Sequence, residues 1–143
     1  MPRGRRPALV FLDANVIFSA AYRPEGRCAA LFELAARGRC SLLTSAYAVT
    51  EADRNLRHKK PEALKAFAAL LETMRVVPEP DPVKQAEAAA LGIDPGDVPI
   101  LAAAIGRCDI LVTGDLKHFG PWMGRSVEVI EIMSPGETLA ALL

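Results

Sequence analysis

Residues 8–20 read ALVFLDANVIFSA, a run of five apolar residues that ends at a single aspartate, Asp13. A run as continuous as Ala8–Leu12 predicts a strand that is covered on both faces, as the strands of a parallel sheet are. A carboxylate directly after such a strand is either a helix cap or part of a functional site. Which of the two applies depends on whether other acidic residues gather at the same edge of the sheet.

Apolar strands alternate with helical segments along the rest of the chain. This alternation predicts a three-layer α/β/α sandwich with a mainly parallel central sheet. We expect one domain over residues 1–143, in which the basic residues 1–7 form a flexible tail. After the first strand, the expected strands are Cys40–Leu43, Arg75–Val77, Asp109–Thr113 and Val127–Ile132, and the expected helices are Asn15–Tyr22, Arg27–Arg37, Ser45–Arg57, Pro61–Met74, 82–91, 98–105 and one that Ser134 opens.

The composition is that of a folded protein without a membrane segment. Of the 143 residues, 51% are hydrophobic and 24% are charged, which excludes a disordered chain. No apolar run approaches the roughly 20 residues that span a bilayer, and the first run is too short for a signal peptide. The cysteines Cys28, Cys40 and Cys108 are odd in number and widely spaced, which is typical of reduced thiols in a cytoplasmic protein.

The net charge is zero, but the charges are unevenly distributed. Residues 1–60 hold 11 Lys and Arg against 5 Asp and Glu, whereas residues 61–143 hold 6 against 12. A neutral total is therefore compatible with a local basic patch that binds a polyanionic partner.

Four acidic residues are candidates for one site, and each also has an ordinary structural explanation. Asp13 can cap the helix that follows it, and Glu51 can be a solvated charge on a helix. Asp97 can cap the next helix, in preference to Asp94, because a proline two residues later fits only in a first helical turn. Asp115 can be a turn residue.

Taken as a set, the four acids indicate a metal site. Asp13 and Asp115 follow buried strands, and Asp97 precedes the helix that leads into the second of them, so all three can share one edge of the sandwich. Carboxylates within a few ångströms of one another repel unless a divalent cation neutralises them. Oxygen ligands of this kind favour Mg²⁺ or Mn²⁺.

Four segments of the chain resemble the PIN-domain family, whose members are metal-dependent ribonucleases. The resemblance covers nearly the whole chain. It implies that one acid from each segment contributes to a single metal-binding and catalytic quartet, formed by Asp13, Glu51, Asp97 and Asp115. The segments are FLDANVIFSA (11–20), TEADRNL (50–56), GDVPILAAAI (96–105) and LVTGDLKHF (111–119).

The resemblance also implies supporting residues and a reaction. Asn15 is expected to support the acids with a hydrogen bond, and Thr113 to contact Asp115, a metal-bound water or a phosphate. One or two ions of Mg²⁺ or Mn²⁺ are expected to promote attack of water on an RNA phosphodiester bond.

A basic segment, RNLRHKK at residues 54–60, ends the helix that carries Glu51. Interaction with the helix C-terminus explains one or two of these cations, so we interpret the others as contacts to RNA phosphates. Because only 6% of the residues are aromatic, recognition of the RNA backbone or shape is expected rather than stacking on its bases. The expected RNA contacts are Arg54, Arg57, Lys59, Lys60 and Lys117.

Many PIN-domain proteins resemble the VapC-type toxin of a toxin–antitoxin pair. We therefore expect RNA and a small antitoxin protein as partners, and we also consider a homodimer. One alternative is a non-catalytic nucleic-acid-binding protein with the PIN fold, against which the intact quartet argues. Another is a haloacid-dehalogenase phosphatase, which needs a second aspartate two residues after the first, where this chain has Asn15.

Overall fold

The computed structural model describes residues 7–114, 126–127 and 130–143. Its sheet has the strand order β3-β2-β1-β4-β6-β5, in which all neighbours are parallel except β5 and β6. The chain moves from β1 outward to β3 and then returns to the other side of β1, so β1 and β4 form the centre. The strands are β1 (Ala8–Leu12), β2 (Cys40–Ser45), β3 (Arg75–Val77), β4 (Ile110–Val112), β5 (Ser126–Val127) and β6 (Ile130–Met133).

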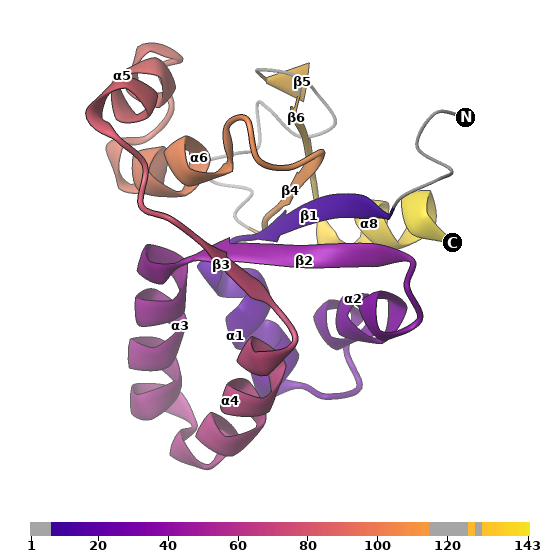
Figure 1. Cartoon of the computed structure of the whole chain (residues 1–143). Coiled ribbons are helices and arrows are strands. Elements are labelled where there is room, and N and C mark those ends of the chain that lie inside the picture. Colours follow the sequence, from indigo (N-terminus) through magenta and orange to yellow (C-terminus); the bar gives the residue numbers. More distant parts are fainter. Residues whose placement is uncertain (1–6, 115–125, 128–129) are drawn as a thin grey trace.

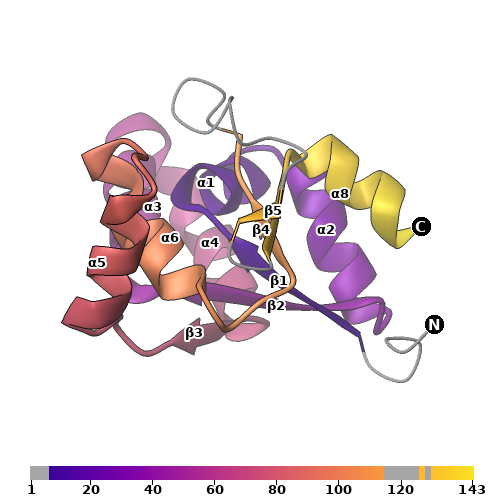
Figure 2. The ribbon, with the colours of Figure 1, turned by 90° about the horizontal axis from the view of Figure 1, so that it is seen from above.

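Helices cover both faces of this sheet, which confirms the expected three-layer sandwich (Figure 1). One face carries α1 (Ala14–Tyr22), α2 (Arg27–Ala36), α3 (Ala46–Lys59) and α4 (Leu64–Glu72), and the other carries α5 (Pro82–Ala90) and α6 (Val98–Ala104). The last helix, α8 (Pro135–Leu142), packs beside α2, as the view from above in Figure 2 shows. None of the helices in the described part of the chain is long and apolar enough to cross a membrane.

Strand β1 is apolar throughout because it contributes to two cores. Val10 and Leu12 belong to the cluster beneath α1 to α4, whereas Phe11 belongs to the cluster beneath α6. All three side chains are fully buried. Successive side chains of a strand point to opposite faces, so a central strand covered on both sides needs an apolar residue at every position.

Local capping signals set several element boundaries, and the expected helix start at Ser45 is its cap rather than its first residue. Ser45 caps α3 by accepting from the N–H of Ala48, and Asp81 caps α5. Ser134 opens α8 with a capping box. Gly38, directly after α2, has a φ of 79°, a conformation that favours glycine at the end of a helix.

Two expectations about elements are wrong. The segment Val127–Ile132 is not one strand, because its two ends belong to separate strands, β5 and β6, that pair antiparallel. The helix expected over Pro61–Met74 is divided into a 3-10 turn at Pro61–Ala63 and α4, because the proline begins a tight turn first. Neither difference moves the central strands that position the site.

Candidate functional site

The central strands β1 and β4 bring two of the predicted site residues together. Leu12 pairs with Val112, and the N–H of Asp13 donates to the carbonyl of Val112 at 3.0 Å. The strand that follows β1 in the sequence, β2, lies on one side of this pair, and β6 lies on its other side, beside β4. Such a switch point in the strand order is where α/β proteins form a ligand crevice. Asp13 and Thr113 each follow the last residue of one of these strands.

The Asp13 carboxylate is buried and held by three donors. The Thr113 hydroxyl donates to its Oδ2 at 2.8 Å, the amide of Asn15 donates to the same oxygen at 3.3 Å, and the N–H of Ala14 donates to Oδ1 at 2.6 Å. The N–H of Gly114 donates to Oδ1 of Asn15 at 2.8 Å. Asp13 therefore caps α1 and lies in the crevice, while Asn15 links the ends of both strands.

Glu51 comes to this crevice on α3. The helix begins directly after β2, and the Thr44 hydroxyl at the end of β2 donates to the carbonyl of Leu12 at 2.9 Å, which ties β2 to the end of β1. Ala52 and Leu56 are fully buried, whereas Glu51 is half-buried. The carboxylate thus lies at the border of the buried face of the helix rather than on its solvated side.

Asp97 does not cap α6, so that expectation is wrong. A 3-10 turn, Pro95–Asp97, precedes the helix, and Asp94 caps this turn by accepting from the N–H of Gly96 at 2.8 Å. The Asp97 side chain makes no capping bond, and its backbone is already helical. The cap moved three residues upstream because the extra turn begins at Pro95. Asp97 itself is buried, with 9% of its surface exposed.

Asp13, Glu51 and Asp97 line one hollow of about 520 Å³, although they come from three separate segments of the sequence. The hollow lies between α1, α3 and the turn before α6. Its other lining residues are Ala14, Asn15, Phe18, Ser19, Tyr47, Asn55, Lys59 and Gly96.

The Tyr47 phenol responds to all three acids. Burial raises the pKa of Tyr47, and the negative charges of Glu51, Asp97 and Asp13 raise it further, while Arg54 lowers it. Because the three carboxylates all raise the pKa of the same phenol, they create one region of negative electrostatic potential in the hollow.

The donor set fits a hard, hydrated cation. Two buried carboxylates and a half-buried one supply only oxygen atoms, which suits Mg²⁺ or Mn²⁺. Burial of a carboxylate costs folding free energy unless a counter-charge or hydrogen bonds offset it. Among the described residues, no three His, Cys, Asp or Glu side chains are close enough to hold a metal by themselves. Asp115 and Lys117, both predicted for this site, lie outside the described residues.

Two of the predicted RNA contacts line hollows at the acids. Lys59 lines the hollow that contains Asp13 and Asp97. Arg54 lines a neighbouring hollow of about 270 Å³, and Glu51 lines both. Glu51 therefore borders two hollows, each of which is also lined by one cation.

The other two described cations of this segment bind within the protein. Arg57 forms an exposed ion pair with Asp53 one turn earlier, with 2.8 Å between Nε and Oδ2. Lys60 donates from Nζ to the carbonyl of Tyr22 at 2.9 Å, which ties the end of α3 to α1. Their contribution to RNA binding stays a prediction.

The sequence reasoning missed Tyr47 and Asn55, which line the hollow on α3. A signal for them was present, because Tyr47, Glu51, Asn55 and Lys59 follow one another at intervals of four residues. Residues at this spacing lie on one face of a helix. Once Glu51 is assigned to the site, the spacing assigns the other three to the same surface.

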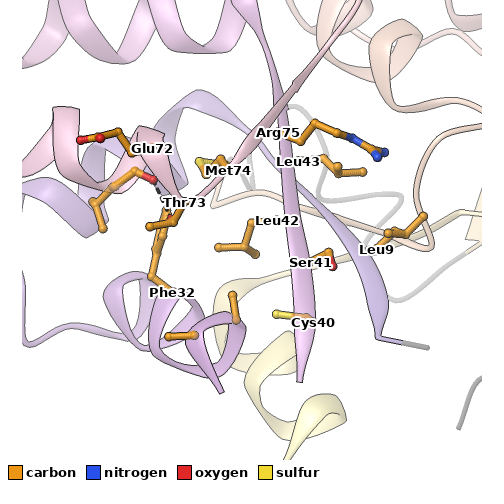
Figure 3. Close-up of a pocket in the computed structure, with 13 residues that line it drawn as sticks. Leu9, Phe32, Cys40, Ser41, Leu42, Leu43, Glu72, Thr73, Met74 and Arg75 are labelled. Carbon is orange, nitrogen blue, oxygen red and sulfur yellow. Dashed lines mark hydrogen bonds between the residues drawn. The ribbon is translucent and has the colours of Figure 1, made fainter. Parts of the chain in front are cut away.

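A second hollow, of about 540 Å³, lies toward the amino ends of β1 and β2 (Figure 3), and Asp13 does not line it. Its apolar lining residues include Phe32, Leu42 and Leu70. The Thr73 hydroxyl is occupied by the carbonyl of Leu70 at 2.7 Å. No acidic cluster lines this hollow, so we place the candidate site at the carboxyl edge.

Comparison with known proteins identifies the family to which the chain belongs. A family model described as PIN domain matches residues 9–117, a range that includes β1, α3, the turn before α6 and β4. The chain belongs to the PIN domain family.

Among solved structures, the chain is similar to one described as the crystal structure of VapBC2 from Rickettsia felis bound to a DNA fragment from their promoter. The TM-score is 0.68 at 17% sequence identity, over 88% of this chain and 98% of that chain. At this identity the likeness shows a shared fold. No curated protein sequence matches the chain significantly.

Proposed function

We propose that this protein is a metal-dependent endoribonuclease. The observation that carries the proposal is the convergence of Asp13, Glu51 and Asp97 on one hollow at the switch point of a PIN-domain sheet. We assign Asp115 to the same quartet, because it comes directly after Gly114, whose N–H is bound by Asn15 in the crevice. These four carboxylates would hold Mg²⁺ or Mn²⁺.

The chain's own residues have distinct parts in this proposal. Thr113 and Asn15 fix the orientation of the Asp13 carboxylate through their hydrogen bonds. Lys59 and Arg54 attract the phosphate backbone from the two hollows that Glu51 borders. A bound divalent ion would supply an activated water and neutralise charge on the phosphoryl oxygens.

We further propose that the protein is the toxin of a toxin–antitoxin pair and acts on RNA in the cytoplasm. The similar fold of a VapBC2 chain supports this role. A small protein encoded by a neighbouring gene would be the antitoxin. Its co-expression should restore the growth of cells in which this chain alone is toxic, and a lack of toxicity would contradict the role. The other partner that we consider is a second copy of the chain. Light scattering would measure the mass of the protein in solution and so show whether it forms a dimer.

The nuclease proposal is tested by comparing wild type with Asp13→Asn, prepared identically, on several RNAs. Wild type should cleave in Mg²⁺ or Mn²⁺, stop in EDTA and leave 5′-phosphate and 3′-hydroxyl ends, since the attacking group is water. Asp13→Asn should fold and not cleave. Equal cleavage by both proteins, or cyclic-phosphate ends, would identify a contaminating ribonuclease. RNA binding by wild type without cleavage would favour the non-catalytic alternative.

A further inference from the structure

The hollow at the candidate site has two chemically different ends. Asp13, Glu51 and Asp97 are acidic. Along α3 the lining continues from Glu51 to Asn55 four residues later and to Lys59 eight residues later, so Lys59 marks the other end. Glu51 and Lys59 are eight residues apart on α3, which is about 12 Å along a helix axis. A strand that follows this face of α3 therefore passes about two helical turns between Glu51 and Lys59.

Lys59 is positioned by aromatic side chains of α1. Its Nζ lies 5.7 Å from the centre of the Phe18 ring, and Phe18 in turn stacks on Tyr22 with 5.4 Å between ring centres. Lys60 covers the Tyr22 ring at 4.8 Å. A cation–π contact holds a cation against a ring without pairing it with a negative charge, so this contact places the Lys59 side chain at the wall of the hollow.

Lys59 differs from its basic neighbours in what it binds. Arg57 is paired with Asp53, and Lys60 donates to a carbonyl of α1. Among the described residues, no carboxylate forms an ion pair with Lys59. Among the described cations of this helix end, Lys59 is thus the one that lines the hollow and has no ion pair with a described carboxylate.

The chemistry of this end is that of a phosphate site. A lysine ammonium binds phosphate as a point charge, and an asparagine amide is a common donor to the nucleic-acid backbone. The Phe18 ring is already covered by Lys59 and stacked on Tyr22, so it offers little open surface for a base. Contact with the backbone is favoured over readout of a base.

Building on the proposed nuclease function, we infer that Lys59 and Asn55 form a phosphate subsite for the RNA strand, next to the phosphodiester that is cut. The strand leaves the acidic end and follows the groove between α1 and α3 toward the C-terminal end of α3. In this proposal the substrate is a single strand or an unpaired segment.

The test measures binding of a short fluorescent oligouridylate by anisotropy at increasing salt, in the Asp13→Asn background to prevent cleavage. Lys59→Gln should weaken binding several-fold and reduce the steepness of log K against log salt by about 0.7, the share of one phosphate contact on a single strand. Lys59→Arg should restore the slope. The matched control is Lys65→Gln, which removes an exposed charge on α4 outside the hollow and should leave the slope unchanged.

Equal slopes for Lys59→Gln and Lys65→Gln would overturn the subsite. If wild type still cleaved RNA in that case, the nuclease proposal would stand without it. A reduced slope for Lys59→Gln, in a protein whose wild type cleaves no RNA, would support the phosphate site and contradict the nuclease. Circular dichroism of each variant checks that the fold is retained.

Discussion

The two hollows at opposite edges of the sheet have nearly the same volume, about 520 Å³ and 540 Å³, but very different walls. The hollow at the carboxyl edge contains the buried carboxylates of Asp13 and Asp97, whereas the hollow at the amino edge has a floor of leucine and phenylalanine (Figure 3). Buried charge opposes folding and apolar contact favours it. Buried charge, not volume, therefore indicates where the function lies.

This comparison predicts opposite responses to substitution at the two edges. At the carboxyl edge, loss of a carboxylate should affect the reaction and leave the fold intact. At the amino edge, loss of an apolar side chain should affect the free energy of unfolding and leave the reaction of the folded molecules unchanged.

The largest expected effect is that of Glu51→Gln on cleavage. The substitution keeps the size of the side chain and removes one charge from the acidic hollow, so we expect a decrease of about a thousandfold, equivalent to about 4 kcal/mol. The matched control is Asp53→Asn, two residues later on α3, which removes only an exposed ion pair with Arg57. Exposed pairs contribute little, so this variant should cleave like wild type. Similar losses in both variants would remove Glu51 from the site.

The next effect concerns the apolar hollow. Leu42 is 3% exposed, and Leu42→Ala should lower the free energy of unfolding by about 2–5 kcal/mol, because it removes buried contacts and enlarges a cavity. Urea denaturation measures this change. Cleavage per folded molecule should equal that of wild type. Lost cleavage without lost stability would show that the amino edge also contributes to function.

The smallest effect is the stabilisation by metal. Mn²⁺ should raise the free energy of unfolding by about 2.7 kcal/mol at a concentration one hundred times its dissociation constant, seen as a rise in melting temperature. Asp97→Asn should lose most of this rise while slightly stabilising the metal-free protein, because it removes repulsion among the acids. The same rise in wild type and Asp97→Asn would exclude Asp97 from metal binding.

The sequence predicts an element well where its hydrophobic pattern is compatible with only one type of structure. The apolar run Ala8–Leu12 requires cover on both faces, and the structure provides it. The sequence does not predict the antiparallel pair of β5 and β6, because apolar and polar residues alternate in the same way in one long strand and in two short ones.

The candidate site is predictable only in part. Asp13 and Thr113 follow apolar strands, and the convergence of strand ends follows from a parallel sheet. Asp97 is expected from the sequence to cap α6, but in the structure Asp94 caps a 3-10 turn that precedes this helix. The extra turn at Pro95 is not evident from the sequence. The different partners of Lys59 and Arg57 depend on side-chain contacts across elements, which spacing along one helix does not specify.

The central claim is that the carboxyl edge binds a divalent metal, and anomalous scattering from a crystal soaked in Mn²⁺ tests it most directly. We predict an anomalous peak in the hollow at bonding distance, near the 2.0–2.1 Å typical of Mg²⁺, from a carboxylate oxygen of Asp13, with Asp97 and Glu51 bound directly or through water. A well-ordered crystal with no peak in this hollow, or with its strongest peak elsewhere, would contradict the assignment.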